Sequence, residues 1–550
     1  MATIGQLAVA ARDGLQEKKA QTDRYMCFVP EWTENAKGNK LINKFSLNTD
    51  EYLNLLKWLG FRRYDTGGKW IVVRVIDNVA EEIEEVHLAD ALMQHINEMP
   101  TSHTYYHAHQ KLKNYVYNST DFLFNKKSKL QYLYDKTPIV FNNDNEKEAF
   151  FYFRNGFVTV TKSGLQFKPY AQMASFTATI DGEPTMIKKT IWKSQLLDRD
   201  FRKVPTEIYQ KFDWYLFLQN ITQKEVPERL DTLQRLLGYI MHSYMNTKLK
   251  AVILTDSAIS EKAEGRSGKT LLGKSVQHIL NPTNATEINK VASELNGKNF
   301  KADDTFRYQT LGLGTKVVIL NDVKPRFKFD QLFNDITEGL DRTRKTEAPV
   351  KLYCKFLIPT NETIELPSGS YKDRAVEFEL SNHYNDKWEP LNDFKKRFFG
   401  NEWTDEDWAC FDNIMLQCVS IYLQKGMPTT IKSINLEKRK LLSECTKEFV
   451  EFMDIKFFGE DETQRILMIP GTDYDEKGEY RKHHSGTQAD ELYNEYLIFN
   501  TDAAKRNFTK HTFNSYIKKY TTYSEHLSKV EDHRSNGVKK YYFFTKNLEK

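Results

Sequence analysis

The chain has 550 residues, 40% of them hydrophobic and 28% charged, which predicts an ordinary globular protein of several domains. Its net charge is only +4, which excludes a polycation, so any nucleic-acid surface must come from a local excess of basic residues. The five cysteines form no CxxC pair, which argues against a disulfide framework and against a cysteine zinc site.

Three features of the sequence predict a cytoplasmic protein. Unpaired cysteines are typical of a reducing, intracellular compartment. The first residues lack the basic start and the sustained apolar run of a signal peptide. No stretch approaches the roughly 18 consecutive apolar residues of a membrane span.

Changes of pattern along the chain divide it into four expected regions. Residues 1–150 mix strand-like and helical patterns, and we expect an α+β domain whose role the sequence does not reveal. Residues 151–247 begin with aromatic hairpins and continue as helices, which suggests a linker or collar used in oligomerisation. Residues 248–425 alternate short apolar strands with helices, which is typical of a sheet covered on both faces. Residues 426–550 are expected to be helical and to end in a basic, aromatic segment.

The segment EGRSGKT, residues 264–270, is a candidate phosphate-binding loop between an apolar strand and a helix. In such a loop, backbone N–H groups and a helix N-terminus point at the phosphates of a nucleotide. Lys269 would bring positive charge to the β and γ phosphates, and the hydroxyl of Thr270 would bind Mg²⁺. The residues expected to bind ATP are Gly265, Arg266, Ser267, Gly268, Lys269 and Thr270.

One departure weakens this interpretation, and an ordinary glycine-rich turn is the alternative. The usual spacing puts a glycine five residues before Gly268, where this chain has Ala263. A second copy of the pattern, residues 273–275, is expected to lie inside the following helix, where its N–H groups would serve helical hydrogen bonds.

Two further apolar strands end in polar residues. The segment KVVILND, residues 316–322, ends in Asp322, which would lie beside a bound Mg²⁺. The segment CKFLIPTN, residues 354–361, ends in Asn361, whose amide could position the attacking water or sense the γ phosphate. The three strand ends follow one another within about a hundred residues, an order that favours a nucleotide triphosphatase.

At this point the chain resembles the superfamily 3 helicases, which are hexameric AAA+ motors, and most closely the helicase part of phage and plasmid primase-helicases. The segments EGRSGKT, KVVILNDV and KFLIPTNETI resemble motifs A, B and C of that superfamily. LFNDITEGLDRTRKTEAPVKL resembles its additional motif, and SYKDRAVEFELSNHYN resembles the segment with its arginine finger, which implies Arg374. The resemblance covers roughly residues 250–400.

The resemblance implies a multidomain α/β protein with an AAA+ P-loop core, in which a central parallel sheet is flanked by helices. It also implies a replicative DNA helicase in a bacterial host cell, a hexameric ring that uses ATP and Mg²⁺ and moves 3′ to 5′ on single-stranded DNA. Its catalytic residues would be Lys269, Asp322, Asn361 and Arg374, with Thr270 and Asp322 at the metal. No polymerising site is visible, so a separate primase or polymerase is a plausible partner.

Asn321 stands where motif B of this superfamily usually has a first acid, and this substitution leaves alternatives open. A DNA-binding replication initiator with a degenerate nucleotide switch would bind ATP without turning it over. A P-loop ATPase that remodels protein would hydrolyse ATP without responding to DNA.

The segment RTRKT places Arg342, Arg344 and Lys345 within four residues, and Lys345 is the foremost candidate for contact with DNA. In the family, the additional motif lies on a hairpin in the central pore and grips the DNA backbone. Such cations contact phosphates without sequence preference. A solvated surface turn is the alternative.

The C-terminal segment TKHTFNSYIKKY, residues 509–520, predicts a helix with Phe513, Tyr516, Ile517 and Tyr520 facing inward. A hairpin with a Ser-Asn-Gly turn is expected after it. This order is the outline of a winged-helix-like domain, and the candidate DNA-binding lysines in it are Lys510, Lys518 and Lys519. A basic, solvated face on a small packed domain is an equal alternative.

Overall fold

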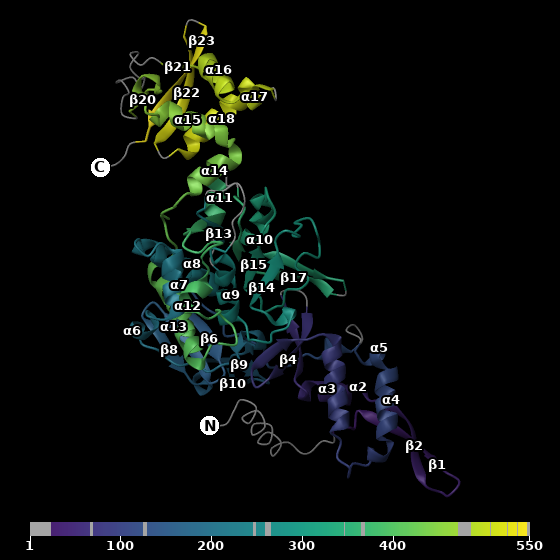
Figure 1. Ribbon diagram of the computed structural model, residues 1–550. Helices are drawn as coiled ribbons and strands as arrows, with labels where there is room; N and C mark the ends of the chain where they lie inside the picture. The colour runs from purple at the N-terminus through teal and green to yellow at the C-terminus, as the bar shows by residue number, and fades with distance from the viewer. Residues whose placement is uncertain are drawn as a thin grey trace.

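The computed structural model describes residues 24–66, 70–124, 129–245, 249–258, 266–345, 347–364, 369–470, 486–505, 508–524, 526–535 and 537–546. Figure 1 shows a central α/β body, an N-terminal part on one side of it and a C-terminal part on another. Within the described ranges, no helix combines the length and the apolar character that crossing a membrane requires.

The N-terminal part joins a projecting hairpin to a small helical core. Its elements are β1 (Phe28–Glu34), β2 (Lys40–Leu47), α2 (Thr49–Trp58), β3 (Phe61–Asp65), β4 (Trp70–Ile76), β5 (Val79–Glu82), α3 (Glu85–Asn97), α4 (His109–Asn118) and α5 (Thr120–Leu123). The side chain of Asn48 accepts two backbone N–H groups at the start of α2, as an N-cap does. Phe28, Tyr52 and Leu92 are fully buried in the core among these helices.

The next part consists of two small sheets followed by helices. Its elements are β6 (Glu148–Phe153), β7 (Gly156–Thr161), β8 (Gly164–Lys168), β9 (Ser175–Ile180), β10 (Glu183–Lys188), β11 (Ile191–Trp192), β12 (Leu196–Leu197), α6 (Thr206–Tyr209), α7 (Asp213–Ile221) and α8 (Pro227–Met241). The hairpins β6–β7–β8 and β9–β10 agree with the aromatic, turn-rich pattern of the sequence. β11 leaves this part and pairs in parallel with β5, so that one sheet has the order β11-β5-β4-β3.

The central body is built on a parallel sheet of five strands. Its elements are β13 (Ala251–Asp256), α9 (Lys269–Leu280), β14 (Ala292–Asn296), β15 (Val317–Asn321), α10 (Phe333–Thr337), β16 (Leu340–Arg344), β17 (Glu347–Leu352), β18 (Lys355–Pro359), α11 (Gly369–Arg374), β19 (Ala375–Leu380), α12 (Pro390–Phe394) and α13 (Asp405–Lys425). The strand order is β14-β15-β18-β13-β19, and every neighbouring pair is parallel. Such a sheet is compatible with a P-loop core.

The expected boundaries at residues 150 and 248 run through shared hydrophobic cores. One core contains Phe151 of β6, Leu237 of α8 and Ile319 of β15. Another contains Ala80 of β5 together with Ile253 of β13. Local periodicity marks where elements begin and end, but it does not show which elements pack together. Residues on both sides of the expected boundaries therefore share a core.

Helices α8 and α13 show how closely these parts are joined. A Cβ atom on Gly238 of α8 would lie 2.1 Å from the backbone oxygen of Cys418 of α13. Only glycine permits this approach, because any side chain at position 238 would overlap the backbone of α13.

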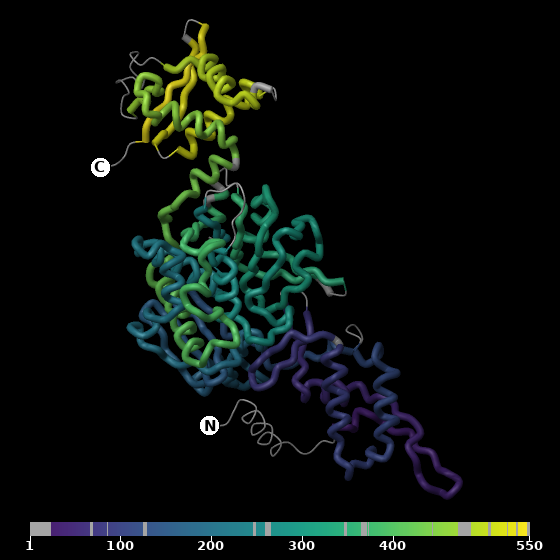
Figure 2. The backbone as a smooth tube through the Cα atoms, viewed as in Figure 1, coloured from purple at the N-terminus to yellow at the C-terminus, as the bar shows by residue number. Residues whose placement is uncertain are grey.

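The C-terminal part has a core of its own, drawn from residues 441–543. Its elements are α14 (Leu436–Glu444), α15 (Lys447–Phe458), β20 (Met468–Ile469), β21 (Thr487–Gln488), α16 (Ala489–Phe499), α17 (Thr501–Lys505), α18 (Lys510–Tyr523), β22 (Leu527–Ser535) and β23 (Val538–Thr545). Figure 2 shows the backbone entering this part through α14. β22 and β23 form the expected hairpin, and β21 pairs with the other edge of β23.

Candidate nucleotide site and hairpin

The topology of the central sheet places a crevice at the carboxyl end of β13. The chain leaves β13 through α9 and reaches the edge strand β14, returns through β15 and β18, and then passes β13 to form β19 on its other side. The direction of the connections therefore reverses next to β13. In open parallel sheets, ligands bind outside the carboxyl ends of the strands where this reversal occurs.

A cavity of about 430 Å³ lies at this position. It gathers the residues that the sequence predicts at the ends of three separate strands, and it is lined by Arg266, Gly268, Lys269, Thr270, Leu271, Asn321, Asp322, Pro359, Thr360, Asn361, Glu389 and Pro390. Gly265, also expected to bind ATP, lies outside the described residues. The cavity volume is within the range of small-molecule sites.

Two of the three described residues directly before α9 have a left-handed backbone conformation. Arg266 and Gly268 have φ angles of 83° and 103°, in the left-handed region. A Cβ atom on Gly268 would lie 2.7 Å from the ring of Phe217, so both the conformation and the space at this position require glycine. α9 begins at Lys269, and its first N–H groups are therefore available to a ligand in the cavity.

Lys269 is held by a carboxylate that sequence reasoning did not select. Its ammonium group forms an ion pair with Asp256, the last residue of β13, and the hydroxyl of Ser267 also donates to Asp256. Lys269 is only 7% exposed, and burial lowers its pKa while Asp256 opposes that shift. A phosphate in the cavity would therefore compete with Asp256 for Lys269. Asp256 ends the apolar strand AVILTD, and this position is the feature of the sequence that could have identified it as a site residue.

The end of β15 carries Asn321 and Asp322 into the cavity. Asp322 has a φ of 56° and forms an exposed ion pair of 2.6 Å with Lys298. The Nδ2 atom of Asn321 donates a hydrogen bond of 2.8 Å to Oε1 of Glu294 on the neighbouring strand β14. Because a carboxylate only accepts hydrogen bonds, this contact turns the amide oxygen of Asn321 away from Glu294. No local pattern could have identified Glu294, because its position depends on the pairing of β14 with β15.

Asn361 follows β18 and presents an unsatisfied acceptor. Among the described residues, none donates a hydrogen bond to its buried Oδ1 atom. Buried polar atoms are nearly always satisfied by protein or water, so this atom fits a water or ligand hydrogen at the cavity. Arg439 of α14 donates to the backbone oxygen of Asn361 at 3.1 Å and also to that of Asp256, so the start of the C-terminal part touches the rim of the cavity.

These groups fit a nucleoside triphosphate with Mg²⁺. The cavity offers a helix N-terminus, a buried lysine, the exposed hydroxyl of Thr270 and the carboxylate of Asp322. In the part of the chain that the structure describes, no cluster of three or more His, Cys, Asp or Glu residues is arranged to hold a metal ion. Mg²⁺ in nucleotide sites is usually held by one or two protein groups together with the phosphates, so such a cluster is not required.

Arg374 lies at the amino ends of the sheet's strands, whereas this cavity lies at their carboxyl ends. It directly precedes β19, whose first residue is level with Ala251 at the start of β13. The cavity is at the other end of these strands, about 17 Å away at about 3.3 Å per residue. The guanidinium group of Arg374 lies 4.7 Å from the centre of the Phe333 ring. The structure therefore does not bring Arg374 together with the residues that line the cavity.

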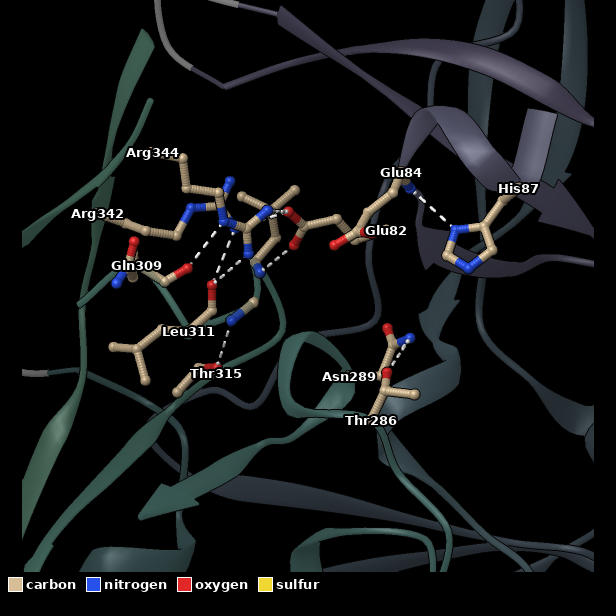
Figure 3. A network of polar contacts seen from close by, with 12 residues as sticks. Glu82, Glu84, His87, Thr286, Asn289, Gln309, Leu311, Thr315, Arg342 and Arg344 are labelled. Atoms are coloured by element: carbon tan, nitrogen blue, oxygen red, sulfur yellow. Dashed lines mark hydrogen bonds and ion pairs between the residues drawn. The ribbon is translucent and has the colours of Figure 1, made fainter. Parts of the chain in front are cut away.

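The segment expected to contact DNA forms the hairpin β16–β17, with Lys345 exposed at its turn. Arg342 is only 1% exposed and forms an ion pair of 2.7 Å with Glu82 of β5, and Arg344 pairs with the same carboxylate at 3.0 Å (Figure 3). The expectation that all three cations face DNA is therefore corrected for Arg342. Its charge is neutralised by an acid 260 positions away, which the local sequence could not reveal.

The three C-terminal lysines differ in their surroundings. On α18, Lys518 is exposed, whereas Lys510 and Lys519 pair with Asp490 and Glu444 at 2.9 and 3.0 Å. These pairs are partly exposed, so DNA phosphates could displace them at little cost. Phe513, Ile517 and Tyr520 are buried as expected, and Tyr516 is half-buried.

No protein-family model matches the chain, and no curated protein sequence is similar to it. Among solved structures, the chain is similar to the apo C-terminal region of NrS-1, with 14% identity, a TM-score of 0.37, and coverage of 90% of this chain and 98% of that one. It is also similar to the JCV helicase, with 13% identity, a TM-score of 0.24, and coverage of 44% and 64%. Similarity this distant does not support a function. The proposed function rests instead on the residues of this chain.

Proposed function

We propose that the protein is an ATP-dependent DNA helicase of the superfamily 3, AAA+ type. The observation that carries this proposal is the cavity at the carboxyl ends of β13, β15 and β18, which is lined by Lys269 at the start of α9, Asp322 and Asn361. Each of these residues comes from a different sequence motif, and the fold brings the three motifs to one edge of the sheet. Such an arrangement suits phosphoryl transfer, in which catalysis consists of positioning and electrostatic stabilisation.

In the proposed reaction, the N–H groups at the start of α9 and the ammonium group of Lys269 bind the β and γ phosphates. Thr270 and Asp322 would hold Mg²⁺, which when bound neutralises charge on the phosphates. Asp322 also orients or activates the attacking water, and the Oδ1 atom of Asn361 accepts a hydrogen bond from that water. If Asn361 instead senses the γ phosphate, its Nδ2 group would donate to a phosphate oxygen. Asp256 returns to Lys269 when the phosphates leave.

The active assembly in this proposal is a ring of identical subunits, and the number we propose is six. Arg374 lies too far from its own cavity to serve it, which supports a role as an arginine finger toward the neighbouring subunit's ATP. Lys345, at the tip of the hairpin β16–β17, would contact the phosphates of single-stranded DNA in the central pore. The family resemblance implies that movement is 3′ to 5′.

The C-terminal part would act as a winged-helix-like DNA-binding domain. The order β21, α16, α17, α18, β22, β23 combines three helices with a hairpin whose strand β23 also pairs with β21. The exposed Lys518 on α18 and the two partly exposed lysines beside it, Lys510 and Lys519, would contact DNA phosphates. This binding should weaken strongly as salt concentration rises.

A second candidate function, a replication initiator with a nucleotide switch, is favoured by Asn321 in the position of an acid. The two functions differ in turnover. We expect the wild-type protein to hydrolyse ATP faster when single-stranded DNA is added. Lys269→Ala should abolish hydrolysis, and Lys345→Ala should keep the basal rate but lose the stimulation.

Three outcomes of this assay are decisive. Binding of ATP without turnover in the wild type would favour the switch. Turnover that does not respond to single-stranded DNA would favour an ATPase that acts on protein. Stimulation of ATP hydrolysis that persists in Lys345→Ala would show that Lys345 does not mediate the response to single-stranded DNA.

A further inference from the structure

The carboxylate of Glu82 is the centre of a buried ionic cluster that joins the N-terminal sheet to the hairpin (Figure 3). Glu82 ends β5 and is only 4% exposed. Its Oε1 atom accepts from Arg342 at 2.7 Å and from Arg344 at 3.0 Å. Its Oε2 atom accepts from the backbone N–H of Leu313 at 2.6 Å. Removing a carboxylate from such a site leaves buried cations uncompensated.

The two arginines extend the cluster to a third segment of the chain. Arg342 also donates to the backbone oxygen of Leu311 at 3.1 Å. Arg344 donates to the same oxygen at 3.0 Å and to that of Gln309 at 2.9 Å. Figure 3 shows both guanidinium groups pointing toward Glu82 and Leu311. The cluster therefore fixes the β16 strand of the hairpin against both the N-terminal sheet and the loop before β15.

The hairpin needs such support because β16 and β17 pair only with each other among the described strands. A two-stranded hairpin is marginally stable alone in water. Its base is anchored by Leu340, Val350 and Leu352, which are buried in the core of the central body. Toward the turn, Arg342 and Arg344 hold β16 in place, and Lys345 follows directly after them.

We propose that Glu82 is a positioning residue for the hairpin, and that the N-terminal sheet serves to present Lys345 to single-stranded DNA. This inference rests on the proposed function. It gives residues 70–82 a role that their sequence does not reveal. It also requires that hairpin and N-terminal sheet move as one body when nucleotide is bound or hydrolysed, because sliding between them would break the buried cluster.

The test compares the full-length wild type with Glu82→Gln, which removes the charge while keeping the size of the side chain. In hydrogen exchange, the amides of residues 340–352 should exchange faster in Glu82→Gln, while those of β13 and α9 remain unchanged. The affinity for single-stranded DNA and its stimulation of ATP hydrolysis should each fall roughly tenfold. Basal hydrolysis and nucleotide affinity should stay within about twofold of the wild type.

A matched control separates positioning from general loss of stability. Asp412→Asn breaks another buried ion pair, 2.6 Å from Arg199, in which Asp412 is 1% exposed. Asp412 lies on α13, whose residues Phe411 and Ile414 belong to a different hydrophobic core from that of the hairpin. This variant should lose thermal stability but keep its response to DNA. Glu82→Asp keeps the charge with a shorter side chain, so it should fold even if Glu82→Gln does not, and its response to DNA should be intermediate.

Two results would overturn the proposal. One is a Glu82 variant whose hairpin exchanges faster while its DNA affinity and stimulation match the wild type. The other is an Asp412→Asn variant that loses as much of the DNA response as Glu82→Gln. A wild-type protein that ignores single-stranded DNA would count against the proposed function instead, and the exchange measurement would still decide whether Glu82 holds the hairpin.

Discussion

At the scale of single residues, Asp256 forms an ion pair with Lys269 and would therefore compete with a bound phosphate for its ammonium group. Asp256→Asn leaves a buried ammonium group without its partner, so the nucleotide-free protein should lose about 3 kcal/mol of its free energy of unfolding. The same change removes a negative charge beside the phosphates, so ATP should bind roughly tenfold more tightly. Thermal unfolding with and without ATP measures both effects. Weaker ATP binding would show that Asp256 supports the nucleotide rather than competing with it.

Asn321 is the residue that bears most directly on whether the protein hydrolyses ATP or uses it only as a switch. Asn321→Asp would supply the acid that motif B usually has, but it would also set two carboxylates side by side, because Glu294 lies 2.8 Å from the present amide. Repulsion should then raise the pKa of one of them and limit the gain. Asn321→Asp with Glu294→Gln should therefore hydrolyse ATP faster than either single variant. Equal rates in Asn321→Asp and the double variant would show that Glu294 does not matter.

At the scale of elements, the glycine that precedes α9 and the glycine inside it predict opposite outcomes on substitution. Gly268→Ala places a methyl group against the ring of Phe217 at a left-handed φ, so nucleotide binding should be lost. Gly273 lies inside the helix, where an added Cβ atom meets nothing nearer than 3.7 Å. Gly273→Ala should raise the free energy of unfolding by about 0.5–1 kcal/mol and keep nucleotide binding. Loss of binding in Gly273→Ala would mean that the second glycine-lysine-serine pattern contacts the nucleotide.

The end of α8 is capped by a buried cation from β18. Lys355 donates to the backbone oxygens of Tyr239, at 2.8 Å, and His242, and burial lowers its pKa to about 7. A lysine in the unfolded chain has a pKa of about 10.4. Between these values the unfolded chain binds one more proton than the folded chain, so the free energy of unfolding rises with pH.

The expected rise is at most about 1.4 kcal/mol per pH unit, and Lys355→Met should remove it. Urea unfolding of both proteins between about pH 7 and pH 9 measures the difference. Identical slopes in the two proteins would mean that Lys355 keeps its proton in the folded state.

At the scale of the whole molecule, the sequence predicts the local parts of the site better than their surroundings. Asp322 and Asn361 are predictable because each ends an apolar strand, and parallel strands present their ends at one edge. The burial of Arg342 is not predictable, because it depends on Glu82 in a sheet that forms far away in the chain. Lys345 lies at the turn and is exposed, a position that a local pattern can predict because it needs no distant partner, and its contact with DNA stays a prediction.

The same reason explains the expected domain boundaries. A boundary drawn at residue 150 follows a change of pattern, yet β11, from the region after that boundary, completes the sheet of β5. The C-terminal part differs, because its helices and hairpin pack mainly on one another and so their order could be predicted from adjacent segments.

The most direct test of the account is strand separation by the full-length protein. Duplexes carrying a single-stranded 3′ tail or a 5′ tail are incubated with ATP and Mg²⁺, with Lys269→Ala and Lys345→Ala as comparisons. We expect the wild type to separate the strands of the 3′-tailed duplex and neither variant to do so. ATP hydrolysis by the wild type without separation of either duplex would contradict the assignment of the protein as a DNA helicase.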